Sequence, residues 1–154
     1  MIMNVKKLQI EQMERKMEAF SGLKSITSPA TGWIRAIRIT LGISLQQLAN
    51  HLGITKQSVG EMEKRERDES ITIKSLRKAA RALNMELVYG FVPIEGTLEA
   101  LIERKAHELA IQIVSRSSQT MRLEDQENSK ERIEKSIEER ALDLKSKMPK
   151  MLWD

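Results

Sequence analysis

The stretch SLQQLANHLGITKQSVGEMEKRER, residues 44–67, decides the fold. Its spacing predicts two short helices, at 44–52 and 55–65, joined by a sharp turn at Gly53. The first helix would turn Leu45, Leu48, Ala49 and Leu52 inward, and the second would bury Val59 and Met62 beneath it. Two helices arranged in this way form a helix-turn-helix.

The outward face of the second helix carries no apolar side chain of any size. Its members are Lys56, Gln57, Gly60, Glu61 and Lys64. Such a face fits the major groove of DNA, where Gln pairs with adenine and Lys donates to guanine. The alternative is an ordinary helical hairpin within a bundle.

Apolar residues recur at helical spacing along nearly the whole chain, which predicts an all-α fold. The expected helices are 4–20, 33–41, 44–52, 55–65, 72–84, 97–118 and 129–148. Ser44, Thr55 and either Ser70 or Thr72 are the predicted N-caps of three short helices.

Three parts are expected from the composition of the chain. They are an N-terminal helix and linker at 1–32, a DNA-binding domain at 33–93 and a C-terminal helical region at 94–154. Residues 1–95 carry 15 Lys+Arg against 10 Asp+Glu, whereas residues 96–154 carry 11 against 12. The basic front part favours a polyanionic partner.

One segment departs from the helical pattern. The β-branched and aromatic residues of ELVYGFV, 86–92, followed by Pro93, predict a strand. Because no second strand is evident, its backbone groups would pair with another copy of the chain. We therefore expect a homodimer joined by a two-stranded ribbon through Leu87, Tyr89 and Phe91. The alternative is an extended apolar segment that covers the helical core.

The composition excludes most catalytic chemistry. The chain has no cysteine, and its two histidines, His51 and His107, lack the spacing of a zinc site. We expect no metal, no cofactor and no enzymatic activity. The absence of an apolar leader and of a run of about 20 apolar residues predicts a cytoplasmic protein without membrane contact.

The 44–67 block, preceded by the basic helix WIRAIR at 33–38, closely resembles the Xre/phage-repressor class of helix-turn-helix domains. The resemblance implies that Lys56, Gln57 and Glu61 touch base edges, with Ser58 nearby. The class often has a DNA-contacting glutamine where this chain has Leu45, and Gln46 or Gln47 would replace it. The resemblance also implies a buried ion pair between Arg38 and Glu63.

A wider resemblance rests on the order of four phrases. GWIRAIR (32–38), ELVYGFVP (86–93), TMRLEDQ (120–126) and LWD (152–154) together resemble the mobile mystery protein A family. This resemblance implies an antitoxin or regulator encoded beside mobile mystery protein B, which carries a Fic domain. Fic domains generally transfer AMP from ATP to a hydroxyl group on a target protein.

Fic enzymes are restrained by a helix with Ser or Thr, three further residues, Glu, and then Gly or Asn. Thr120 and Glu124 fit this pattern, while Asp125 departs from it. A glutamate at the ATP site can pair with the arginine that should hold the γ-phosphate. We expect apolar contacts with the Fic protein from Leu109, Ile113, Met121 and Leu123. The alternative is a polar pair one turn apart on a solvated face.

These features favour a DNA-binding antitoxin that autoregulates its operon and inhibits a Fic-domain partner. The alternative is a plain dimeric repressor whose C-terminal helices oligomerise or sense a ligand. The segment 120–124 distinguishes the two functions, because a plain repressor has no use for an inhibitory glutamate.

Overall fold

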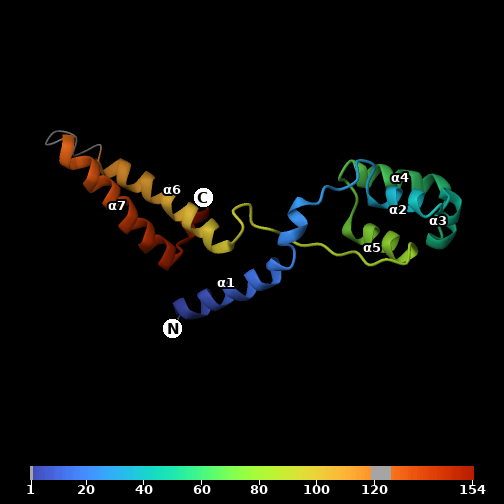
Figure 1. Cartoon of the computed structure of the whole chain (residues 1–154), viewed down its shortest axis with the longest axis horizontal. Coiled ribbons are helices and arrows are strands. Elements are labelled where there is room, and N and C mark those ends of the chain that lie inside the picture. Colours follow the sequence, from blue (N-terminus) through green and yellow to red (C-terminus); the bar gives the residue numbers. More distant parts are fainter. Residues whose placement is uncertain (1, 119–125) are drawn as a thin grey trace. The chain divides into compact units, whose positions relative to one another are not determined.

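The computed structural model describes residues 2–118 and 126–154, and the side chains of 5–117 and 130–154. All regular elements in these residues are helices (Figure 1). They are α1 (Ile2–Glu18), the 3-10 helix η1 (Ser21–Ser25), α2 (Trp33–Thr40), α3 (Leu45–Leu52), α4 (Lys56–Arg67), α5 (Ile73–Ala82), α6 (Leu98–Ser118), α7 (Gln126–Lys147) and the 3-10 helix η2 (Lys150–Trp153). The predicted all-α class fits these residues.

The chain forms two compact units. The four-helix unit contains residues 23–90 with α2 to α5, and the hairpin unit contains residues up to 22 together with 91–154. The hairpin unit therefore includes α1 as well as α6, α7 and η2. This division differs from the predicted one, because α1 belongs with the C-terminal helices instead of forming a separate part with the linker.

The short helices of the four-helix unit begin at local side-chain caps. Ser44 and Gln47 form a capping box, in which Ser44 Oγ accepts from the Gln47 amide at 3.0 Å and Gln47 Oε1 accepts from the Ser44 amide at 2.8 Å. Thr55 and Thr72 accept from the amides of Ser58 and Ser75, both at 3.1 Å. The predicted caps at Ser44 and Thr55 are confirmed, and Thr72 caps α5.

The core of the four-helix unit lies between α2, α3, α4 and α5. It consists of Ile34, Leu48, Ala49, Val59, Met62, Ala79 and Leu83. The small side chain of Ala49 is fully buried, which allows α3 to pack closely on its neighbours. Gly53 ends α3 with a left-handed φ of 66° and turns the chain into α4. The predicted helix-turn-helix is therefore α3, Gly53 and α4.

The prediction of a dimerising strand is wrong. None of the described residues, 86–92 included, forms a strand or a bridge. Tyr89 and Phe91 are 56% and 83% exposed, while Leu87 is half-buried. Residues with high strand propensity form a strand only when a neighbouring edge accepts their hydrogen bonds, and the described chain offers none. Leu87, Tyr89 and Phe91 thus lie in an extended segment instead of a ribbon.

In the hairpin unit, α6 and α7 lie side by side as an antiparallel pair (Figure 1). Its core consists of Ile102, Ala106 and Ala110 of α6, Leu144 of α7 and Leu152 of η2. Small residues one turn apart on α6 allow the two backbones to approach closely. From α1, Ile10 packs on this core, and Glu14 Oε1 accepts from the amide of Glu99 at 2.9 Å, in the first turn of α6.

Candidate nucleic-acid interface

The helix α4 is divided lengthwise into two faces. Val59, Met62 and Glu63 are buried. The outward face carries Lys56, Gln57, Glu61 and Lys64, all exposed. Within the part of the chain that the structure describes, these four side chains make no hydrogen bond or ion pair. Their donors and acceptors are therefore available to a partner, and we call these four residues the reading face.

The other two predicted DNA contacts are engaged locally. Ser58 is half-buried, and its hydroxyl group lies 2.8 Å from Thr55 Oγ1 within the cap of α4. Gln46 is exposed on α3, and its Nε2 donates to Asn50 Oδ1 at 2.9 Å. Gln47 uses its carbonyl oxygen in the capping box of α3. Gln47 could turn toward DNA only by breaking the capping box, whereas Gln46 and Ser58 would each lose only a hydrogen bond between side chains.

A buried ion pair holds α4 against α2. Arg38 Nε donates to Glu63 Oε1 at 2.6 Å, and Arg38 Nη2 donates to Glu63 Oε2 at 3.3 Å. Arg38 Nη1 also donates to the carbonyl oxygen of Ile43 at 3.0 Å, just before α3. Arg38 and Glu63 are only 9% and 6% exposed. The pair thus joins α2, α4 and the turn before α3 in a fixed geometry.

Glu66 is a second anchor, which the sequence pattern did not predict. Its Oε2 accepts from the amide of Trp33, and its Oε1 accepts from the amide of Ile34, both at 2.8 Å. The signal that could have revealed it is Gly32, since this N-cap residue has no side chain to cap α2. A helix that begins in this way needs an acceptor from elsewhere in the chain.

The surface of the four-helix unit is basic. Residues 23–90 contain 11 Lys+Arg and 6 Asp+Glu, a net charge of +5. On α5, Lys74, Arg77, Lys78 and Arg81 are exposed, and the helix contains no acidic residue. At 100° per residue these four positions share roughly one side of the helix. The positive potential of this unit attracts polyanions such as DNA.

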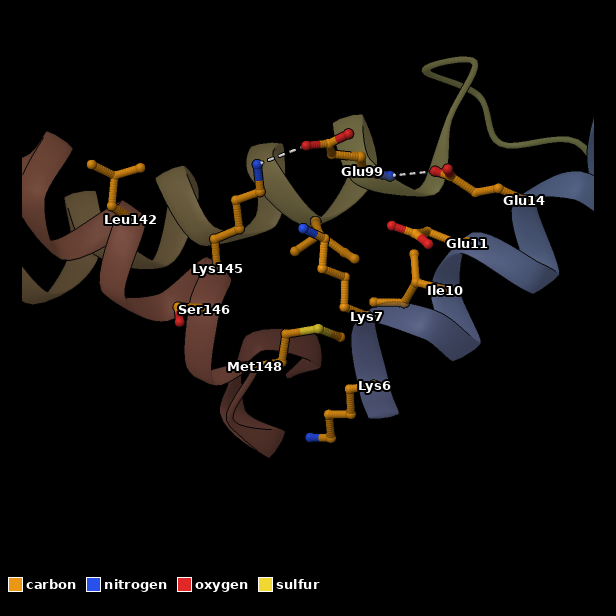
Figure 2. Close-up of a pocket in the computed structure, with 11 residues that line it drawn as sticks. Lys6, Lys7, Ile10, Glu11, Glu14, Glu99, Leu142, Lys145, Ser146 and Met148 are labelled. Carbon is orange, nitrogen blue, oxygen red and sulfur yellow. Dashed lines mark hydrogen bonds and ion pairs between the residues drawn. The ribbon is translucent and has the colours of Figure 1, made fainter. Parts of the chain in front are cut away.

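The hairpin unit has a hollow of about 380 Å³ between α1, α6 and α7 (Figure 2). Charged side chains of both signs surround it, and two of them, Lys145 and Glu99, form an ion pair. Lys145 Nζ donates to Glu103 at 2.6 Å and to Glu99 at 3.1 Å, and these hydrogen bonds raise the pKa of Lys145. The charged residues that line this hollow also include Lys6, Lys7 and Glu11 of α1.

The residues predicted to inhibit a Fic protein, Thr120 and Glu124, lie outside the described residues, as do Met121 and Leu123. Leu109 and Ile113 pack partly buried against the core of the hairpin unit. Part of their apolar surface is thus used within the chain, and their contact with a Fic protein stays a prediction.

The described residues, 2–118 and 126–154, contain neither a metal-binding cluster nor a membrane-spanning helix. No group of three or more His, Asp or Glu in these ranges could hold a metal ion. None of the helices in the same ranges is both long enough and apolar enough to cross a membrane.

A helix-turn-helix family model matches residues 34–89, which lie within the four-helix unit. No curated protein and no solved structure matches the chain. The chain therefore contains a helix-turn-helix domain, a class that binds DNA and does not catalyse reactions. The match does not extend to the hairpin unit, and none of these comparisons supports the narrower resemblance to mobile mystery protein A.

Proposed function

We propose that this protein is a sequence-specific DNA-binding regulator that reads the major groove with α4. The observation that carries the proposal is the reading face, whose four exposed side chains have no partner among the described residues. Lys56 and Lys64 would donate to guanine, and Gln57 would pair with adenine. The net charge of +5 in residues 23–90 supports phosphate binding beside this face.

The test is selection of an operator from random duplexes, followed by affinity measurements on single variants. Gln57→Ala and Lys56→Ala should each weaken operator binding by about 1–3 kcal/mol, because each removes one base-edge contact. Gln112→Ala and Lys135→Ala are matched controls, because both residues are exposed in the hairpin unit. Unchanged affinity in both α4 variants would contradict the assignment of the reading face.

The narrower proposal is an antitoxin that represses its own operon and inhibits a Fic-domain protein. The four-phrase resemblance and the Thr120 to Glu124 spacing support it. The carboxylate of Glu124 would compete for the arginine that binds the γ-phosphate. Such a regulator would work in the cytoplasm, beside its operon and its partner.

Co-purification with the Fic protein, followed by labelling with radioactive ATP, tests this narrower role. Glu124→Gly should leave DNA binding intact and release AMP transfer, and Thr120→Ala should release it more weakly. Glu131→Gly is the matched control, because Glu131 is exposed on α7. Equal, low AMP incorporation by the wild type and Glu124→Gly would show that the restraint works by another route, such as steric burial of the groove that binds the target. A Fic protein that does not co-purify would favour the plain repressor.

A homodimer also belongs to the proposal, without the strand. One recognition helix reads only a few base pairs, so regulators of this class pair two helices on an inverted repeat. The half-sites should lie roughly 10 bp apart, or a multiple of that distance. Sedimentation with and without operator, together with a footprint, measures this. A monomer that protects a single half-site would contradict it.

A further inference from the structure

The N-terminus of α2 is capped by a side chain from α4. The first amides of a helix have no partner within the helix, and a carboxylate at this end also interacts favourably with the helix dipole. Glu66 supplies both of its oxygens here, one to Trp33 and one to Ile34, each at 2.8 Å. Glu66 of α4, the proposed recognition helix, therefore takes the place of the N-cap side chain that α2 lacks.

Gly32 makes room for this carboxylate. A Cβ atom at position 32 would lie 2.9 Å from Glu66 Oε1, closer than real Cβ atoms come, and 3.0 Å from Glu66 Cδ, so the carboxylate would have to move. Gly32 also has a φ of +86°, which side chains disfavour. The contact between the Glu66 carboxylate and the start of α2 thus depends on both Gly32 and Glu66, and we call it the clamp.

The clamp lies beside the buried ion pair on the same helix. Glu63 and Glu66 are one turn apart on α4, roughly 4.5 Å along its axis. Glu63 binds Arg38 near the end of α2, whereas Glu66 binds the start of α2. The two carboxylates together attach α4 to both ends of α2, which fixes the direction of α4 as well as its distance.

We propose that Glu66 is a positioning residue for DNA reading, which acts through α2 and does not itself touch DNA. This inference rests on the proposed DNA binding. Base readout depends on where the reading face points, whereas non-specific binding depends mainly on phosphate charge. Loss of the clamp should therefore reduce the ratio of operator affinity to non-specific affinity.

The first experiment measures this ratio in single variants at a temperature well below unfolding. Glu66→Ala should lower it roughly tenfold, as much as the loss of one base contact. Glu66→Gln keeps the chain length and one acceptor, so it should recover part of the ratio. Glu86→Ala removes an exposed carboxylate from the same unit and should leave the ratio unchanged.

The second experiment combines the two halves of the clamp. Gly32→Ala should lower the ratio strongly in the wild type and weakly in Glu66→Ala, because the close contact is then already gone. Gly42→Ala is the control, because Gly42 has a φ of +71° and a Cβ atom added there would meet nothing within 4 Å. Its effect should be equal in both backgrounds. Additive effects of Gly32→Ala and Glu66→Ala would overturn the inference.

Hydrogen exchange separates failure of the clamp from failure of the proposed function. The amides of Trp33 and Ile34 should exchange faster in Glu66→Ala, while the amide of Leu48 in the core stays protected. Equal protection in both proteins would overturn the clamp even if operator binding stands. Faster exchange with an unchanged affinity ratio would leave Glu66 a structural cap only, and would also overturn the inference. A wild type that selects no DNA sequence would end the proposed function and the positioning role, while the exchange result still reports on the clamp.

Discussion

The two units of this chain differ in how deeply their best-placed ion pairs are buried. In the four-helix unit, Arg38 and Glu63 form an ion pair that is almost completely buried. In the hairpin unit, the described ion pairs of Lys145 and Arg104 lie at the surface. The four-helix unit carries a net charge of +5, whereas the residues of the hairpin unit carry 15 Lys+Arg against 16 Asp+Glu.

This difference indicates which unit holds its helices, and so its surface side chains, in one fixed arrangement. A buried ion pair costs desolvation energy and contributes little net stability, but it restricts how the helices can be arranged. We infer that the four-helix unit uses this restriction to orient α4. The hairpin unit packs through small and branched apolar residues such as Ala106 and Ala110, which need no such device.

Each unit has its own tryptophan, so their stabilities can be measured separately. Trp33 begins α2 and Trp153 ends η2, and they are 47% and 48% exposed. A Trp153→Phe background would report unfolding of the four-helix unit, and a Trp33→Phe background would report the hairpin unit. Substitutions placed in these two backgrounds therefore compare the units directly.

The largest effect is expected for Arg38→Ala in the four-helix unit. Removal of the guanidinium leaves Glu63 as a buried charge without its partner, so the free energy of unfolding should fall by about 3–5 kcal/mol. Urea unfolding followed by Trp33 fluorescence measures this loss. Arg35→Ala is the control, because Arg35 is exposed on the same helix. Equal losses in the two variants would contradict the contrast between buried and surface charge.

A smaller effect is expected for Ala110→Leu in the hairpin unit. Ala110 is fully buried between α6 and α7, so the larger side chain must push the helices apart and should cost about 1–3 kcal/mol. Trp153 fluorescence in the Trp33→Phe background measures this loss of stability. Gln112→Leu adds a similar side chain at an exposed position of α6 and should cost less than Ala110→Leu. If the two variants are equally stable, α6 and α7 are not closely packed at this point.

Much of the four-helix unit could be predicted from the sequence, because its signals are local. Gly53 and the caps Ser44 and Thr55 lie within a few residues of the helix ends that they define. The anchors Glu66 and Glu14 could not be predicted in this way, because they lie 33 and 85 residues from the amides of Trp33 and Glu99 that they bind. Interhelical hydrogen bonds of this kind depend on packing instead of sequence spacing.

The prediction of a strand at 86–92 failed for the same reason, because strand formation also depends on contacts that the local sequence does not contain. The residue types at 86–92 favour an extended backbone. A strand also needs the edge of a second strand with which to form hydrogen bonds. In the four-helix unit, Leu87 and Val88 instead lie beside the apolar residues of α2 and α5 around a hollow of about 280 Å³. Of these residues, Leu87 is half-buried, whereas Val88, Tyr89 and Phe91 stay largely exposed.

The caps of the four-helix unit allow a finer test. Thr72→Ala should cost about 1 kcal/mol, because the amide of Ser75 loses its acceptor. Ser70→Ala should cost much less, since the Ser70 hydroxyl makes only a hydrogen bond of 3.4 Å to the carbonyl oxygen of Arg65. Trp33 fluorescence in the Trp153→Phe background measures both. A larger loss in Ser70→Ala would contradict the observed cap.

The smallest effect is expected for Lys145→Met, at the surface of the hairpin unit. Surface ion pairs contribute about 0.2–1 kcal/mol, and salt screens them, so the loss should shrink further in 1 M salt.

Hydrogen bonds to Glu103 and then Glu99 raise the pKa of Lys145 above its ordinary value. A raised lysine pKa stabilises the folded chain while the amine stays protonated, and this contribution disappears only above about pH 10. The difference between Lys145→Met and wild type should therefore stay constant from about pH 6 to pH 9. Trp153 fluorescence in the Trp33→Phe background measures it, with Lys135→Met as a control, because Lys135 is exposed on α7. A loss that matches Arg38→Ala and resists salt would show that the hairpin unit also depends on desolvated charge, which would remove the contrast between the two units.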